Sequence, residues 1–513
     1  MALDTLSSTL ERPRRGDLIA GLSVAIVLIP QSLAYAEIAG LPAFIGLYAA
    51  ALPPLAAAFL ASSRYLQTGP VAMTALLTFG ALSDLATPGS DAYIEQAIVL
   101  ALIVGLARIV LGLVRGGIVA YLMSSPVLIG FTSAAAILIV ASQIPTALGV
   151  AGGGGGLLGN AWDALIDPGA WSAAGLGVGL IAAAVLVAGR RVSRRFPGVL
   201  LAVIVGLIYS QFVSSDLPVV GEVPTGLPAF QFTFGLDYFW NLVIPGIVIA
   251  LVGFAEAAAI SRTFATQDRE RWDPNREFIS QGVANVASAI SGGFPVGGSF
   301  SRSSIAKISG AQTRWAGAVT GLAVLAFLPF ASVIESLPRA VLAAIVIVAV
   351  FRLIRVATMV RLIGKTWGQA FVAWATFIAT LVLSPRIDLG VVIGLLVAAA
   401  VHFRRETLLR VSSDQEAGLL VLRPSGVLFY GSAPRLDEAF SRHLAAFPDL
   451  EEVVIDLEGL GRIDYTGALA LKEFIDSAEA AGLEVSVRDI PEHAQGTLER
   501  SWGDELTHHR WEG

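Results

Sequence analysis

The chain contains no cysteine at all, which excludes disulfide bonds, thiol catalysis and thiolate metal sites. It has only five histidines, all of them from His402 onward, so the long apolar part before that residue offers nothing for a histidine-based metal site. No catalytic His–Asp or Ser–His set is visible there either, and we expect neither an enzyme nor a bound cofactor.

Charge is also scarce. Charged residues make up 14% of the chain against 55% hydrophobic residues, and the mean hydropathy is +0.72. Between Leu18 and Ser63 the only charged side chain is Glu37, and the segment from Gly116 to Trp162 has none. Such runs are long enough to cross a hydrocarbon core of about 30 Å more than once. The composition therefore predicts an α-helical polytopic membrane protein.

Loop signals between the apolar runs predict about fourteen spans. We place them at residues 17–36, 44–61, 70–83, 94–114, 124–145, 170–188, 197–214, 238–262, 277–292, 299–309, 313–333, 338–352, 366–384 and 387–403. They form a transmembrane domain over residues 17–405, with one repeat at about 17–214 and a second at about 238–403.

Arginine and lysine recur in alternate connections between these spans. The basic set includes Arg12, Arg14, Arg15, Arg64, Arg108, Arg115, Arg190, Arg191, Arg194, Arg195, Arg262, Arg269, Arg271, Arg352, Arg355, Arg361, Lys365, Arg404 and Arg405. By the positive-inside rule these connections are cytoplasmic. We expect a multi-pass protein of the cell membrane with both termini in the cytoplasm, residues 1–16 forming the N-terminal segment without a cleavable signal peptide.

After Arg405 the composition becomes that of a soluble α/β unit, over residues 413–513. The stretch "EEVVIDLEGL" predicts a buried strand, "TGALALKEFIDSAEAAGL" an amphipathic helix closed by Gly482, and "LEVSVRDI" another strand. This unit offers a surface for a cytoplasmic protein partner. We predict no nucleic-acid partner.

No ATP-driven motor is expected. The glycine run at 152–156 lacks the lysine and hydroxyl residue of a phosphate-binding loop, and the only "GKT", at 364–366, has Met359 where that motif needs glycine. We read the glycine run as a flexible outer loop.

Two interrupted segments carry the strongest functional signal: "LQTGPVAMT" (66–74) and "FPVGGSFSRS" (294–303). Each is an extended Pro/Gly stretch that leads into a short apolar helix, in matching places of the two halves. Paired breaks of this kind indicate a transporter site built from inverted repeats. The first turn of a helix leaves N–H groups unpaired and partly positive, so two such ends that meet inside the membrane would bind an anion.

The candidate binding residues therefore lie on these two segments. They are Thr68, Gly69 and Val71 on the first, and Gly297, Gly298, Ser299, Phe300, Ser301 and Arg302 on the second. The alternative is a well-packed kinked helix whose Arg302 reaches to the cytoplasmic surface.

The first span adds Gln31 and Tyr35 as polar groups at membrane depth, after a helix break at Pro30. Glu37 and Glu256 are lone acids in apolar segments, where a charge is costly, and we predict that they couple transport to protons. The alternatives are a hydrated Glu37 at the end of its span and a structural ion pair of Glu256 with Arg262 or Arg302.

These motifs resemble the sulfate permease family with its cytoplasmic STAS domain. The segment "PAFIGLYAAALPPLAAAFLASSR" (42–64), "PQSLAYA" (30–36) and "GSFSRS" (298–303) are similar to family signatures, and "VVIDLEGLGRIDYTGALAL" (453–471) is similar to the STAS signature. The resemblance runs nearly end to end.

The resemblance implies a seven-plus-seven inverted repeat, in which a core domain (spans 1–4 and 8–11) moves the substrate against a gate domain (spans 5–7 and 12–14), often in a homodimer. It places the anion between the third and tenth spans. Arg302 matches a basic residue near the bound anion, and Glu256 an acid linked to protons in sulfate transporters and to sodium in bicarbonate transporters.

One departure concerns the STAS unit. Domains that act as phosphorylation switches carry Asp-Ser-Ser-Gly, whereas this chain has Asp464, Tyr465, Thr466 and Gly467. Tyrosine stands in the phosphoserine position, which argues against that switch, while Asp464 remains suited to cap a helix.

We therefore expect a secondary active transporter of a small anion, a C4-dicarboxylate such as fumarate or sulfate, coupled to protons. Compact loops and a short tail are typical of a bacterial uptake protein. Sodium-coupled bicarbonate transport, anion exchange and an anion channel stay open, and a STAS-mediated signalling scaffold is the alternative from another class.

Overall fold

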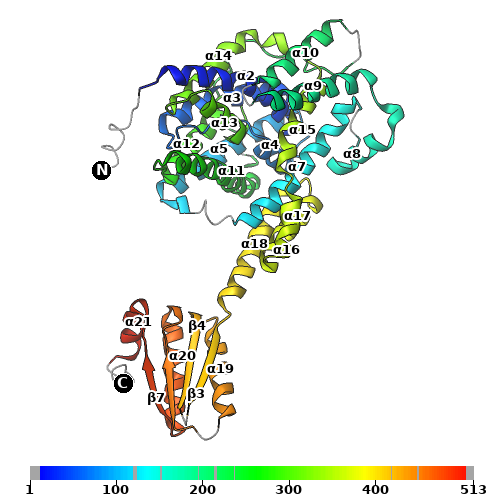
Figure 1. Cartoon of the computed structure of the whole chain (residues 1–513). Coiled ribbons are helices and arrows are strands. Elements are labelled where there is room, and N and C mark those ends of the chain that lie inside the picture. Colours follow the sequence, from blue (N-terminus) through cyan, green and yellow to red (C-terminus); the bar gives the residue numbers. More distant parts are fainter. Residues whose placement is uncertain are drawn as a thin grey trace. The chain divides into compact units, whose positions relative to one another are not determined.

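A computed structural model describes residues 12–118, 124–150, 153–193, 196–212, 217–235, 237–416, 419–447 and 450–503. Most of the predicted N-terminal segment, the end of the soluble unit, and Arg194 and Arg195 of the basic set lie outside these residues. The chain divides into two compact units, Met1–Leu396 and Val397–Gly513 (Figure 1).

The first unit is helical, and each of the fourteen predicted spans coincides with a helix. These helices are α2 (Arg15–Ile38), α3 (Ala43–Leu60), α4 (Ala72–Leu82), α5 (Asp91–Leu113), α7 (Ser125–Leu148), α9 (Ala173–Val192), α10 (Gly198–Phe212), α11 (Phe239–Asp268), α12 (Pro274–Ile290), α13 (Phe300–Ile308), α14 (Trp315–Phe327, continued by η3, Leu328–Ile334), α15 (Arg339–Val350), α17 (Trp367–Val382) and α18 (Ile387–Glu406). The predicted fold class is confirmed.

Two further helices were not predicted. α8 (Gly156–Ile166) begins at the last glycine of the run read as a flexible loop, while residues 153–155 of that run are not helical. α16 (Val356–Ile363) lies in a basic connection and buries Met359 against α7 and α17. Both helices are too short to stand out as apolar spans, and each has one apolar face only.

The order of elements repeats along the unit. In the first half α2 and α3 are followed by a two-residue strand β1 (Thr68–Gly69) and then α4 and α5; in the second half α11 and α12 are followed by β2 (Gly297–Gly298), α13 and α14. These elements pack on one another across the halves, α12 against α5 and α3, and α14 against α3 and α2. They form the core.

The remaining spans make a second group, in which α15 packs on α7 and α9, α17 on α7, and α10 on α9. This group corresponds to the gate. It meets the core mainly where α2 contacts α15 and α10, and where α4 contacts α7.

Glycines allow the close helix contacts. A Cβ on Gly46 of α3 would lie 1.9 Å from the carbonyl oxygen of Ser32 on α2, and one on Gly130 of α7 would lie 2.2 Å from that of Ala373 on α17. Lipid is as apolar as a leucine side chain, so membrane helices associate through such close packing rather than through the hydrophobic effect. The Gly46-Leu47-Tyr48 motif therefore has a packing role.

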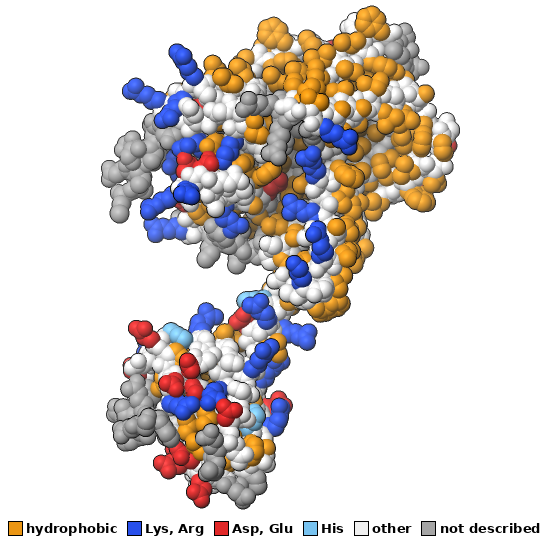
Figure 2. Space-filling view, viewed as in Figure 1, with side chains coloured by type: hydrophobic (Ala, Val, Ile, Leu, Met, Phe, Trp, Pro, Cys, Tyr) orange, Lys and Arg blue, Asp and Glu red, His pale blue; other side chains and the backbone are white. Residues whose placement is uncertain are grey.

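Large apolar side chains cover the outside of this unit (Figure 2). Phe212, Trp240, Trp367 and Val382 are among the most exposed. A water-soluble surface would not present so wide an apolar area, and it is the surface that lipid tails cover.

The second unit is the predicted α/β domain. Its five strands are β3 (Arg410–Glu416), β4 (Leu419–Leu428), β5 (Glu452–Asp456), β6 (Leu460–Ile463) and β7 (Glu484–Arg488), and its helices are α19 (Ala433–Ala446), α20 (Tyr465–Ala480) and α21 (Glu492–Trp502). The sheet runs β3-β4-β5-β7, with β6 also paired to β4; β3 is antiparallel to β4 and the other pairs are parallel.

The two strands and the helix predicted here are confirmed. Asp464 caps α20 by accepting a hydrogen bond from the Gly467 amide at 2.7 Å, and Gly482 ends that helix with φ of +90°. Leu422 and Ile455 from the sheet pack with Phe440, Leu471 and other helix residues in a core of the unit's own.

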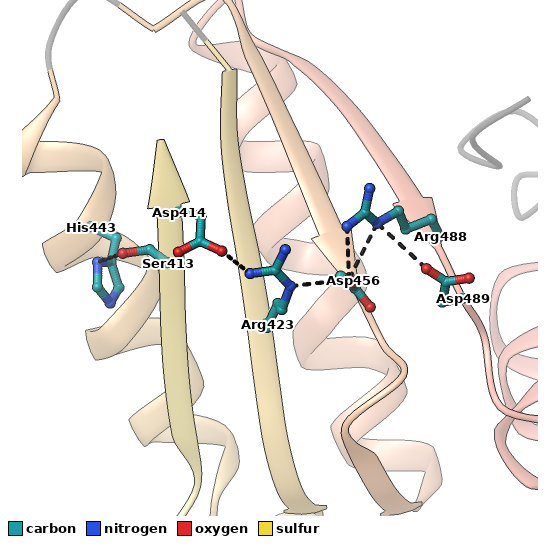
Figure 3. Close-up of polar contacts among 7 residues, drawn as sticks. All are labelled: Ser413, Asp414, Arg423, His443, Asp456, Arg488 and Asp489. Carbon is teal, nitrogen blue, oxygen red and sulfur yellow. Dashed lines mark hydrogen bonds and ion pairs between the residues drawn. The ribbon is translucent and has the colours of Figure 1, made fainter. Parts of the chain in front are cut away.

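A row of charged side chains crosses the face of the sheet opposite this core (Figure 3). Asp456, at the end of β5, accepts hydrogen bonds from Arg423 Nε at 3.2 Å and from Arg488 Nη2 at 2.9 Å, and Arg423 also pairs with Asp414. Burial opposes the charge of Asp456, but the hydrogen bonds from Arg488, the Glu458 amide and Arg423 outweigh it and hold its pKa below the ordinary value.

The close contact at Gly46 gives a test of the packing. We expect Gly46→Ala to destabilise the detergent-solubilised protein by about 1–3 kcal/mol, because the new methyl group has no room. The matched control is Gly177→Ala on α9, where a Cβ would meet nothing within 4 Å and alanine is the better helix former. Thermal unfolding measures both; equal melting temperatures for the two variants would contradict the packing role.

The charged row predicts how the soluble unit responds to pH. Because the pKa of Asp456 is lower in the folded state than in the unfolded chain, its stabilisation is fully present above about pH 4 and is lost as the pH falls through the folded-state value. At pH 7 we expect Asp456→Asn to cost a fragment of residues 407–513 about 1.5–3 kcal/mol, and the difference from the unsubstituted fragment to shrink below about pH 4.

Urea unfolding over a pH series measures this effect. Glu438→Gln is the control, because its pair with Arg442 is exposed on α19 and contributes little. A cost for Asp456→Asn that stays constant down to pH 2 would contradict the assignment.

Candidate functional site

The two interrupted segments cross inside the core. β1 pairs with β2 in antiparallel register, Thr68 opposite Gly298 and Gly69 opposite Gly297. The prediction that residues 66–74 and 294–303 lie together is confirmed, although they are more than 200 residues apart in the chain. The pairing also satisfies backbone groups that an isolated break would leave unpaired in the membrane.

Each strand leads directly into the N-terminus of a short helix. The first hydrogen bond of α4 runs from the Ala75 amide to the Val71 carbonyl at 3.0 Å, so the three preceding N–H groups have no acceptor in their own helix, and no side chain caps this end. Ser299 caps α13 by accepting from the Arg302 amide at 3.4 Å. Two partly positive helix ends therefore adjoin one crossing.

Arg302 is the most informative side chain. It is completely buried, and in the described part of the chain none of its three guanidinium nitrogens has a hydrogen-bond acceptor. It also stands in the first turn of α13, where a positive charge opposes the helix dipole. A buried charge in this state costs several kcal/mol unless something negative joins it. Burial overturns the alternative in which Arg302 reaches the surface.

Gly69 makes room for this guanidinium. A Cβ on Gly69 would lie 3.5 Å from Arg302 Nη2 and 3.4 Å from Leu28 Cδ1, and the φ of Gly69 is +149°, a conformation that disfavours any other residue. The crossing thus brings Arg302 of one repeat against the backbone of the other.

Two predicted residues from other spans lie near Arg302. Tyr35 of α2 and Glu256 of α11 both lie within electrostatic range of it. Gln31, one turn before Tyr35, is buried, and its side-chain oxygen has no donor among the described residues. The described residues thus leave the Arg302 guanidinium nitrogens without a hydrogen-bond acceptor and the Gln31 oxygen without a donor.

The other predicted residues divide into two sets. Thr68, Val71, Gly297 and Gly298 are buried at the crossing, with Val71 Cγ2 3.2 Å from where a Cβ of Gly297 would lie. Phe300 and Ser301 are exposed, and Phe300 stacks on Phe264. The structure thus does not bring the side chains of Phe300 and Ser301 to Arg302.

A buried polar network that sequence reasoning missed holds the crossing. Gln281 Nε2 of α12 donates to Thr68 Oγ1 at 2.7 Å, and Asn285, one turn later, donates to the Val296 carbonyl at 3.1 Å and accepts from the Val296 amide at 2.9 Å. The signal was available, because two amides four residues apart share one face of an apolar span.

The position of Arg108 was predicted wrongly from the sequence. We assigned it to a basic cytoplasmic connection, but it lies within α5 and is completely buried in the core. It is therefore no marker of topology.

Glu37 links the core to the gate. It lies at the end of α2, and its carboxylate is 3.2 Å from Arg339 Nε at the start of α15. Arg339 Nε donates its hydrogen bond to the Val219 carbonyl, so the contact with Glu37 is electrostatic. The ion pair overturns the alternative in which Glu37 is merely hydrated.

Metal binding finds no support here. No group of three His, Asp or Glu side chains that could hold a metal ion occurs in the part of the chain that the structure describes.

The fold and the crossing define a polytopic membrane transporter with a C-terminal α/β domain. The chain belongs to the sulfate permease family: residues 15–376 match that family and residues 410–506 match the STAS domain. This confirms the resemblance and the prediction of a transporter rather than an enzyme.

Similar proteins agree with this membership. The chain is 30% identical to "Probable sulfate transporter 4.2" of Arabidopsis thaliana over 96% of its own length and 79% of that protein. It is 32% identical to "Probable sulfate transporter MT1781" of Mycobacterium tuberculosis (strain CDC 1551 / Oshkosh) over 79% of this chain and 72% of that protein. The solved structure of SLC26A9 has the same fold, with a TM-score of 0.87 at 19% identity over 97% of this chain and 88% of that one.

The unpaired state of Arg302 gives a test that separates binding from folding. We expect Arg302→Gln to raise the Kd for a small anion about 30-fold or more, since the main charge partner is lost. The anion-free protein should be as stable as before or more so, because a buried unpaired charge has gone.

Thermal shift with and without sulfate measures both effects. Arg361→Gln is the control, because Arg361 is an exposed arginine that also donates to a backbone carbonyl. A variant that keeps the sulfate-induced shift but unfolds at a lower temperature would show that Arg302 is structural.

Proposed function

We propose that this protein is a secondary active transporter that moves a small inorganic or carboxylate anion across the cell membrane, with sulfate as the first candidate and C4-dicarboxylates such as fumarate as the second. The observation that carries the proposal is the completely buried guanidinium of Arg302, without an acceptor among the described residues, beside two helix N-termini.

The chemistry of the pocket supports a dianion. A guanidinium offers up to five N–H donors, and each helix end adds backbone N–H groups in a fixed arrangement. Sulfate and dicarboxylates present several acceptor oxygens and two negative charges, which match such a set of donors. The names of the relatives, which are sulfate transporters, favour sulfate.

The arrangement of the helices supports alternating access. The anion would move with the core, whose α4 and α13 hold the site, while the gate helices α7 and α15 stay in place. The Glu37–Arg339 ion pair joins these two parts. Its breaking and reforming would accompany the movement of the core.

The two carboxylates support proton coupling. Glu256 lies close enough to Arg302 to compete with a bound anion for its charge, and Glu37 can give up Arg339 only by becoming neutral or by solvation. Protonation of either group would compensate one charge of an entering dianion. We therefore propose proton symport rather than coupling to sodium.

The remaining features of the proposal follow the topology. The basic connections, without Arg108, still favour a cell-membrane protein with both termini in the cytoplasm. We also propose that it forms a homodimer and that the STAS domain offers a surface to a cytoplasmic protein.

Uptake by proteoliposomes tests the function. We expect concentrative uptake of labelled sulfate under an imposed inward proton gradient, rising as the external pH falls, with unlabelled fumarate, bicarbonate and chloride compared as competitors. In Glu37→Gln the dependence on pH should flatten, because that carboxylate can no longer bind and release a proton.

Glu95→Gln is the matched control, since Glu95 is an exposed acid at the start of α5. Uptake that ignores pH and follows a sodium gradient would reverse the choice of coupling ion. Downhill flux alone, without accumulation, would identify a channel instead.

A further inference from the structure

Arg108 is a buried cation that the proposed transport cycle does not use. It lies in the C-terminal half of α5, has no exposed surface, and forms no ion pair among the described residues. A cation in an apolar core needs a reason, because its burial costs several kcal/mol.

Its hydrogen bonds all go to uncharged backbone acceptors. Nε donates to the Ala250 carbonyl at 3.1 Å and Nη2 to the Ile249 carbonyl at 3.2 Å, both on α11, while Nη1 donates to the Val296 carbonyl at 3.0 Å. A Cβ on Gly253 of α11 would lie 2.5 Å from Nη2, so that glycine leaves room for the guanidinium. The three carbonyls satisfy the N–H groups but leave the unit charge without a counter-ion.

This charge lies directly behind the crossing. Val296 is the residue before Gly297, which pairs with Gly69 in the antiparallel register of β1 and β2. A Cβ on Gly253 would also lie 3.2 Å from Thr74 Cγ2 in the first turn of α4, so Gly253 separates the guanidinium from that turn. Arg108 thus lies near both interrupted segments.

We infer that Arg108 is a positioning residue of the anion site that holds the Val296 backbone in place and supplies a second positive charge, favouring doubly charged over singly charged anions. The inference rests on the proposed function. Arg108 does not touch the anion; it acts on it through the Val296 backbone and through the electric field.

An electrostatic effect of Arg108 on the anion can be distinguished from a purely structural role. The interaction energy between two charges is proportional to each charge, so removing one cation costs a dianion twice the free energy that it costs a monoanion. The factor by which the Kd of the dianion rises is then the square of the factor by which the Kd of the monoanion rises. By Coulomb's law at an effective dielectric constant of about 20, a roughly tenfold change for a monoanion is the effect of one unit charge at about 11 Å.

The contacts suggest a variant that should fold. In Arg108→Met the Ile249 and Ala250 carbonyls keep their places in α11, and the Val296 carbonyl keeps its hydrogen bond from Asn285. The apolar side chain also leaves no buried polar group unpaired. Arg108→Lys keeps the charge but loses the planar fork that reaches three carbonyls.

The experiment measures the Kd of labelled sulfate and its competition by nitrate for the full-length protein. We expect Arg108→Met to weaken nitrate about tenfold and sulfate about a hundredfold. Arg108→Lys should keep the ratio of sulfate to nitrate affinity within about threefold of the unsubstituted protein, and Arg361→Gln on the exposed face of α16 should change neither.

Three results would overturn the inference. The first is sulfate binding by Arg108→Met equal to that of the unsubstituted protein. The second is a loss of affinity by the same factor for sulfate and for nitrate, in Arg108→Met and also in Arg108→Lys. That result would indicate that Arg108 only supports the backbone. The third is an unsubstituted protein that binds neither anion, which would also remove the proposed function, whereas the first two leave it intact.

Discussion

A guanidinium without an acceptor, at the point where two broken helices meet, is the constraint on which the core of this protein depends. Arg302 is buried against the backbone of Gly69, and no group in the described part of the chain accepts a hydrogen bond from its guanidinium. The protein tolerates the cost because the site is complete only when an anion is present. The antiparallel pairing of β1 and β2 and the amides of Gln281 and Asn285 all hold the donors in place for that event.

The two halves of the chain contribute different groups to the anion site. The first repeat contributes an uncapped helix end at α4 and the small residue Gly69, while the second contributes Ser299 as a cap and Arg302 as the charge. The crossing of the two segments lets one half supply the cation and the other the small residue that makes room for it. Arg108 adds a cation from α5, a span outside the crossing itself.

The contact between core and gate is sparse and specific. Glycine permits the closest approach of α4 to the gate, where a Cβ on Gly80 would lie 2.2 Å from the Pro385 carbonyl. Glu37 and Arg339 add an ion pair at the end of α2. Few contacts of this kind suit two bodies that move against each other, since a large interlocked interface would hold them in one arrangement.

The sequence by itself determined the architecture. Apolar runs, their breaks and the change in composition after Arg405 were sufficient to predict fourteen spans, the two crossing segments and the α/β unit, because lipid demands long apolar helices and tolerates a break only at a cavity. The sequence motifs indicated the family. They also indicated Arg302 and Tyr35, whose side chains lie within electrostatic range of each other in the structure.

Only the tertiary structure decided which charges are surface features and which are buried. Arg108 and Arg361 look alike in the chain, each a lone arginine in an apolar context, yet one is enclosed by three backbone carbonyls and the other is exposed. The sequence also did not show that Phe300 and Ser301 are exposed, or that Glu37 forms an ion pair. Burial and pairing depend on neighbours that are distant in sequence, and the periodicity of one helix contains no information about them.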